Sequence, residues 1–161
     1  MGLFSFLKDA GAKLFHTGGT AAPVDPNADI IAHKNEVIAK LQGTISSLGL
    51  QIDNGSMDLN DTCDTVTVFG QCQTQSEKEK IVLAVGNTDG IAYVDDRMTV
   101  LNPEPEADFY TVQKGDSLSK ISKEFYGDYM RYPEIFEANK PMLTHPDLIY
   151  PGQVLRIPKA A

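Results

Sequence analysis

The stretch of the chain best suited to bind an ion is AVGNTDGI, from Ala84 to Ile91. A helix-like run ends there at a glycine, a short Asn-Thr-Asp loop follows, and a second glycine precedes a strand. The last four carbonyl oxygens of a helix have no partner within it, and this end carries the negative pole of the helix dipole. The loop therefore offers main-chain oxygens to a cation. A plain helix end, in which both glycines serve only backbone geometry, is the alternative interpretation.

A second helix end is expected near the N-terminus. Apolar residues recur there at helical spacing: Leu3, Phe4, Leu7, Ala10, Leu14 and Phe15. Residues 1–15 are therefore predicted to form an amphipathic helix that docks on the rest of the chain and has its first stop at Gly11. If the two helix ends meet, their carbonyls would form a neutral oxygen cage of the type that replaces the hydration shell of potassium in selectivity filters. A weakly ordered helix and a membrane-surface anchor are the alternatives.

The composition narrows the class of partner. The 161 residues include 22 acidic and 14 basic ones, for a net charge of -8, and no cluster of basic residues stands out. Nucleic acid and anionic membranes are therefore poor partners, and cations and neutral ligands remain as candidates. Cys63 and Cys72 lack the spacing of zinc or thioredoxin sites and are expected to be reduced thiols. No secretory signal or membrane-spanning run is recognised, so a cytoplasmic location without a membrane partner is expected.

The chain up to residue 101 predicts a small α+β unit. After a flexible connector at 16–27, we expect a helix at 29–48, strands at 57–60 and 65–70, a helix at 75–85 and a strand at 91–101. This order predicts helices that cover one face of a sheet. The hairpin followed by SEKEKIVLAVGNTDGIAYVDD resembles the BON domain family, which implies a small α/β sandwich over residues 28–101.

The C-terminal part resembles a different family. After a Pro- and Glu-rich linker at 102–108, the sequence predicts a strand at 109–112, a helix capped by Ser117, a helix at 133–139 and a strand at 154–157. Residues 109–158 resemble the LysM domain family, which implies a βααβ fold. The positions that carry this resemblance are Tyr110, Val112, Gly115, Asp116, Leu118, Ile121, Tyr126, Gly127, Ile135, Asn139, Pro151, Gly152, Leu155 and Pro158.

LysM domains in general bind glycans that contain N-acetylglucosamine. The resemblance places such a groove between residues 115–118 and residues 149–151. The same positions also serve the fold, as a turn glycine, a helix cap, a core leucine and a proline turn. Because the chain shows no export signal, we favour the structural interpretation and keep peptidoglycan or N-acetylglucosamine binding as the alternative function.

Over nearly its whole length the chain resembles a family of bacterial cytosolic potassium-binding proteins that pair a BON domain with a C-terminal LysM domain. The resemblance implies a monomeric potassium sensor in which ion binding compacts the two domains. It also implies a set of ligands that are all backbone carbonyls: Leu7, Ala10, Gly86, Thr88 and Ile91. Rubidium or caesium could take the place of potassium.

The type of ligand favours potassium over calcium. Calcium sites recruit several carboxylates, and the loop offers only Asp89. Asp89, Asp95 and Asp96 could tune the local field, but we favour a solvated turn and strand edge as their role. Carbonyl groups that point together repel one another, so the N-terminal helix is expected to detach when the ion leaves. The sequence shows no nucleophile-base pair, metal cluster or phosphate loop, and an enzyme is not expected.

Overall fold

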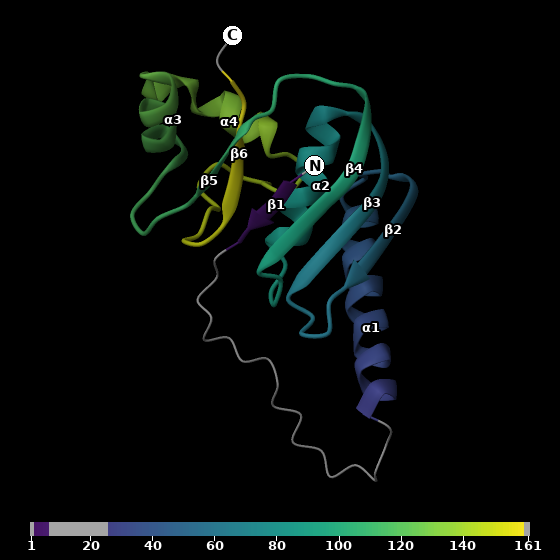
Figure 1. Ribbon diagram of the computed structural model, residues 1–161. Coiled ribbons are helices and arrows are strands. Elements are labelled where there is room, and N and C mark those ends of the chain that lie inside the picture. The colour runs from purple at the N-terminus through teal and green to yellow at the C-terminus, as the bar shows by residue number, and fades with distance from the viewer. Residues whose placement is uncertain (1, 7–25, 160–161) are drawn as a thin grey trace.

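The computed structural model describes residues 2–6 and 26–159, which fold into two adjoining units (Figure 1). The elements are β1 (Gly2–Ser5), α1 (Pro26–Ser47), β2 (Asp53–Leu59), β3 (Thr65–Thr74), α2 (Gln75–Gly86), β4 (Tyr93–Asn102), β5 (Asp108–Thr111), α3 (Leu118–Tyr126), a 3-10 turn at Tyr129–Arg131, α4 (Tyr132–Ala138) and β6 (Val154–Ile157). The larger unit is a sheet in the order β1-β4-β3-β2 with α1 and α2 on one face, and the smaller pairs β5 with β6 beside α3 and α4. The predicted α+β class is confirmed.

β3 and β4 form the centre of the larger unit. They run parallel, with α2 as the crossover between them, and β2 and β1 add antiparallel strands on the two sides. Every second side chain of the central strands faces the helices, as expected for a sheet with one covered face. These buried side chains include Val66, Val68, Val94 and Met98, which pack with Ile81, Leu83 and Leu41 from the helices.

The predicted N-terminal helix is wrong for the residues that the structure describes. Gly2–Ser5 is strand β1, which pairs antiparallel with β4. Its side chains alternate, since Leu3 is 66% exposed, Phe4 is half-buried and Phe6 is 1% exposed. The edge of β4 explains the difference, because its backbone N–H and C=O groups need partners and a neighbouring strand supplies them. The predicted helix end at Gly11 lies outside the described residues.

The other predicted elements are present in the described residues, with shifted boundaries. α1 begins at Pro26, so the last two residues of the predicted connector 16–27 are helical, and the rest of that connector lies outside the described residues. β6 has its predicted bounds. The predicted cap of α3 is also confirmed, because the hydroxyl oxygen of Ser117 accepts a hydrogen bond from the backbone N–H of Lys120 at 3.2 Å. None of the described helices is both long and apolar enough to cross a membrane.

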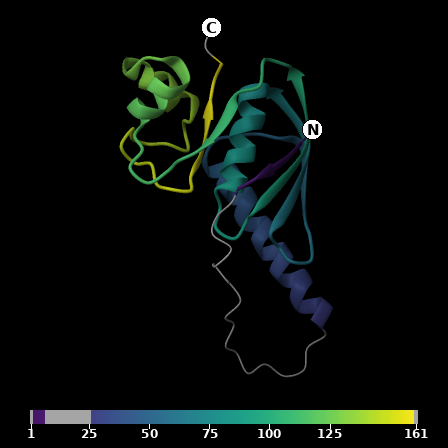
Figure 2. The ribbon, with the colours of Figure 1, turned by 60° about the vertical axis from the view of Figure 1, so that its left-hand side comes forward.

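The two units share an interface, in which β6 runs alongside α2 (Figure 2). The core of the smaller unit is separate and consists of Val112, Leu118, Ile121, Ile135, Leu143, Leu155 and Ile157. Val154, at the start of β6, instead packs in the core of the larger unit. The rings of Phe4 on β1 and Phe109 on β5 lie 5.1 Å apart, so the N-terminal strand also contacts the smaller unit.

Candidate ion-binding site

Helix α2 ends at Gly86, and the loop that follows satisfies most of its last turn. The backbone N–H of Asn87 donates to the carbonyl of Leu83 at 2.8 Å, and the N–H of Thr88 donates to that of Val85 at 3.1 Å. The Thr88 hydroxyl donates to the carbonyl of Ala84 at 2.9 Å. The next carbonyl in the series, that of Gly86, receives no hydrogen bond from the described residues. It is the first helix-end oxygen left for another partner.

The direction of the Gly86 carbonyl follows from the peptide geometry. In a trans peptide the C=O group points opposite to the N–H of the next residue. Because the N–H of Asn87 points back into the helix toward Leu83, the oxygen of Gly86 points out beyond the helix end. The negative pole of the helix dipole and this oxygen therefore face the same space.

The other two predicted loop ligands differ from each other. The N–H of Ala92 donates to the backbone carbonyl of Asp64, just before β3, at 2.8 Å. The carbonyl of Ile91, in the same peptide group, therefore points away from β3. No donor in the described residues reaches it. The carbonyl of Thr88 accepts the N–H of Ile91 at 3.2 Å. A carbonyl oxygen has two lone pairs, so the Thr88 oxygen keeps one for an ion. All three oxygens belong to one short loop.

The N-terminal strand leads directly to this loop. The N–H of Phe6 donates to the carbonyl of Ala92 at 2.7 Å, and the Phe6 ring lies against Gly86. A Cβ atom at position 86 would overlap three atoms of that ring, so a glycine is required for the ring to pack there. Leu7 and Ala10, the other two predicted ligands, lie outside the described residues, but Leu7 follows Phe6 directly in the chain.

Three carboxylates lie in or near the loop, and they differ in burial. Asp89 is exposed, whereas Asp95 pairs with Arg97 at 3.0 Å. Asp96 is 1% exposed on β4, where it accepts from Lys78 at 3.0 Å. Within residues 2–6 and 26–159, no three His, Cys, Asp or Glu side chains are grouped to hold a metal. The main-chain oxygens that the loop presents are neutral, and neutral oxygens suit a large monovalent cation better than calcium.

The smaller unit contacts the same loop. The side-chain amide of Asn87 donates to the carbonyl of Val154 at 2.9 Å and accepts the N–H of Val154 at 2.9 Å. Burial, and after it the negative charge of Asp89, raises the pKa of Tyr150. Residues 86–91, the candidate ion loop, are therefore part of the interface between the two units.

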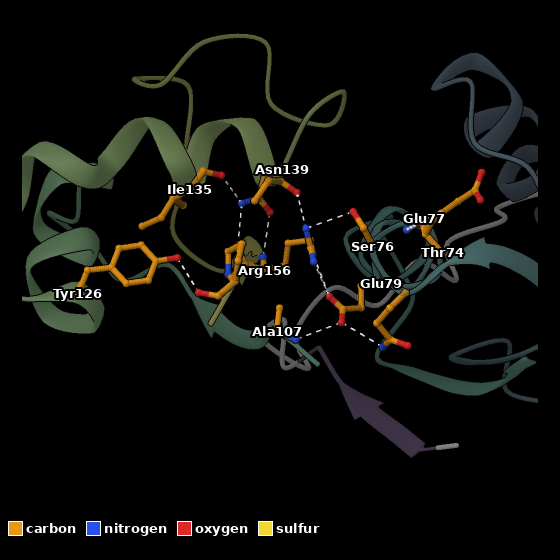
Figure 3. A network of polar contacts seen from close by, with 12 residues as sticks. Thr74, Ser76, Glu77, Glu79, Ala107, Tyr126, Ile135, Asn139 and Arg156 are labelled. Atoms are coloured by element: carbon orange, nitrogen blue, oxygen red, sulfur yellow. Dashed lines mark hydrogen bonds and ion pairs between the residues drawn. The ribbon is translucent and has the colours of Figure 1, made fainter. Parts of the chain in front are cut away.

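A buried polar network holds the interface nearer the start of α2 (Figure 3). The guanidinium of Arg156 on β6 bonds the carboxylate of Glu79 through Nε and Nη2, each at 2.9 Å. The same carboxylate accepts from the N–H of Ala107 at 3.0 Å and from the side chain of Gln75 at 3.1 Å. The additional hydrogen bonds to Glu79 help to offset the cost of burying the charged Glu79–Arg156 pair.

The sequence reasoning missed three contributors to this region: Phe6, Asn87 and the Glu79–Arg156 pair. Each acts through a partner that is distant in the chain, as Asn87 does with Val154. A short local pattern carries no information on such pairs. The buried glycine at position 86 was the one available signal, because a glycine at a helix end often marks a close approach by another group.

Residues 115–118, predicted to line one side of a LysM glycan groove, serve the fold. The Asp116 carboxylate accepts from the Tyr110 hydroxyl at 2.6 Å and from the N–H of Gln113 at 2.8 Å. The hydrogen bond to Asp116 raises the pKa of Tyr110 to about 12. Gly115 has φ of 87° and Leu118 is 2% exposed. A turn, a cap and a core residue account for this loop.

Comparison with known proteins identifies the family of the smaller unit and relatives of the chain. Residues 110–158 match the LysM domain family. Over 159 residues the chain is 45% identical to the protein named "Potassium binding protein Kbp" from Escherichia coli O6:H1, covering 99% of both chains. It is also 57% identical over 49 residues to a protein of Deinococcus radiodurans named "Uncharacterized protein", covering 30% of this chain and 19% of that protein. With 45% identity over almost its entire length, the chain belongs to the family of the E. coli protein Kbp.

Proposed function

We propose that this protein binds a potassium ion through main-chain oxygens and acts as a potassium sensor in the cytoplasm. The ligands are the carbonyls of Gly86, Thr88 and Ile91 in the loop, together with those of Leu7 and Ala10. The observation that carries the proposal is the meeting of the N-terminal strand with the loop, where Phe6 bonds Ala92 and packs on Gly86. The name of the E. coli relative supports the same ion.

The chemistry of the loop supports a large monovalent ion. The carbonyls of Gly86 and Ile91 have no donor in the described part of the chain, so binding an ion costs them no internal hydrogen bond. The only carboxylate in the loop, that of Asp89, is exposed. Rubidium and caesium carry the same charge and are expected to bind in the same cage, whereas a small divalent ion lacks the charged ligands it prefers.

The proposed mechanism is an ordering of residues 7–11 on the loop by the ion. Carbonyl oxygens that converge without a cation repel one another, so the closed arrangement is stable only when the ion is present. Since the loop also bonds Val154 of the LysM unit, closure of residues 7–11 on the loop compacts the two units. Binding of the ion by a monomer is in this way converted into a change of shape that a partner can read.

The test is a comparison of thermal unfolding in KCl and in NaCl at equal ionic strength. A ligand at a hundred times its dissociation constant stabilises the bound protein by about 2.7 kcal/mol. For a chain of this size the melting temperature should rise by about 5 to 10 °C in KCl. Equal melting in the two salts, or stabilisation by chitin oligomers instead, would contradict the proposal.

A matched pair of variants tests the N-terminal ligands. Deletion of residues 2–11 would also remove β1 and the buried Phe6, so we replace only Leu7–Gly11 with Gly-Ser-Gly-Ser-Gly. This variant should lose most of the potassium-dependent shift, because a flexible segment does not pre-position its carbonyls. The control carries the same five residues in place of 18–22, within the predicted connector, and should keep the shift. A full shift in the first variant would remove Leu7 and Ala10 from the ligand set.

A further inference from the structure

The edge of β6 that faces away from β5 is capped by two asparagine side chains. Asn139, from the same unit, donates to the carbonyl of Arg156 at 2.9 Å and accepts the N–H of Arg156 at 2.9 Å. Asn87, from the ion loop of the other unit, makes the same pair of bonds with Val154, both at 2.9 Å. Each amide therefore replaces one residue of a missing neighbouring strand.

The position of Asn87 connects this edge to the proposed ion site. The peptide group between Gly86 and Asn87 carries the Gly86 oxygen, so whatever holds Asn87 also holds that oxygen. Among the described residues, the backbone N–H of Asn87 donates to the carbonyl of Leu83, and its side-chain amide bonds the backbone of Val154. Val154 is a firm anchor because it is 4% exposed and belongs to the core of the larger unit.

We propose that Asn87 is a positioning residue of the potassium site, which transmits the docking of the LysM unit to the direction of the Gly86 carbonyl. This inference rests on the proposed function and adds a regulation of the same site. The coupling is reciprocal, because a contact that raises the affinity for the ion must be strengthened by the ion to the same extent. Any partner that displaces Val154 from the loop should weaken potassium binding.

The contribution of Asn87 can be separated from domain docking in general. Arg156 and Glu79 join the same two elements two helical turns earlier on α2, so the units remain linked when Asn87 is replaced. The backbone of Asn87 has φ of -79° and ψ of -3°, which alanine adopts without strain. Asn87→Ala therefore removes the side-chain amide without straining the backbone.

The first experiment is calorimetric titration of the full chain with KCl. Asn87→Ala should raise the dissociation constant for potassium about tenfold, which corresponds to about 1.4 kcal/mol. The matched control is Asn102→Ala, which also removes an amide bonded to a backbone carbonyl, at the far end of β4. The control should stay within about twofold of the unaltered protein, a difference of about 0.4 kcal/mol. Equal dissociation constants for Asn87→Ala and the unaltered protein would overturn the inference.

The second experiment follows two backbone amides by hydrogen exchange in the unaltered protein. Potassium should slow exchange at Val154, whose N–H bonds Asn87, several-fold more than at Arg156, whose N–H bonds Asn139. This measurement uses only the unaltered protein, so it does not depend on whether a variant folds. If Asn87 had a purely structural role, potassium would not change hydrogen exchange at Val154. Equal effects of potassium at the two amides would overturn the inference. Absence of potassium binding by the unaltered protein would instead refute the proposed function, on which the inference rests.

Discussion

The contact between Phe6 and Gly86 predicts how Gly86→Ala changes the free energy of unfolding. The substitution should destabilise the unaltered protein but not a variant that lacks the Phe6 ring. In the otherwise unaltered protein, Gly86→Ala places a methyl group in overlap with the Phe6 ring, which is 1% exposed. Overpacking of this type costs about 1–3 kcal/mol. Alanine at a helix end recovers at most about 1 kcal/mol through its higher helix propensity. The variant should therefore be destabilised by up to about 3 kcal/mol, with about 1–2 kcal/mol at the middle of the range.

The Phe6→Ala background removes the overlap. That substitution alone should cost about 3–5 kcal/mol, as is usual for a buried phenylalanine. Adding Gly86→Ala to it should be neutral or stabilising by up to about 1 kcal/mol, since only the helix propensity remains. The coupling energy between the two positions should thus be about 2 kcal/mol.

Urea unfolding of the four proteins gives these free energies. The measurements are made in NaCl and repeated in KCl. If the ring holds the N-terminal segment against the ion loop, Gly86→Ala should also reduce the extra stability that potassium provides. Gly86→Ala that is neutral or stabilising in both backgrounds would show that the ring does not pack on Gly86, and would refute the assignment of the N-terminal strand to this loop.

Two further predictions concern buried groups away from the loop. Arg156→Met should destabilise the protein by about 3–5 kcal/mol in urea unfolding, because it leaves the Glu79 carboxylate buried without its cation. Adding Glu79→Leu should recover most of that loss. Equal losses of stability in the single and double variants would contradict this prediction. Burial raises the pKa of Cys72 to about 11, so its thiol favours the folded state below the ordinary thiol pKa, and this contribution is lost as the pH rises from about 9 to 11. Over that range the unaltered protein should lose up to about 2–3 kcal/mol more than Cys72→Ala, and parallel pH profiles would contradict the prediction.

Local patterns predicted most of the elements because local physics decides them. The Ser117 cap, the run of α2 and the bounds of β6 follow from capping and periodicity within a few residues. Gly2–Ser5 is different, since a segment this short has no strong preference of its own. Its conformation is decided by the open edge of β4, which is about ninety residues away in the chain and can be recognised only in the folded sheet.

The candidate site also has a part that the sequence predicts and a part that it does not. The loop at 86–91 is recognisable because a helix end, two glycines and a single carboxylate lie close together in the sequence. Its setting is not recognisable, because Asn87 meets Val154 and Glu79 meets Arg156 only across the interface of the two units. Backbone ligands add a further difficulty, since a carbonyl is present at every position and leaves no residue type as a signal.

A monovalent cation held by main-chain oxygens of the loop after α2 can be located in a crystal. Anomalous diffraction from crystals grown in RbCl makes this measurement, because rubidium takes the place of potassium and gives its own signal. One strong peak is expected within coordinating distance of the Gly86, Thr88 and Ile91 oxygens, and excess KCl should abolish it. A peak elsewhere in the molecule, with the loop empty at saturating rubidium, would show that these oxygens do not hold the ion.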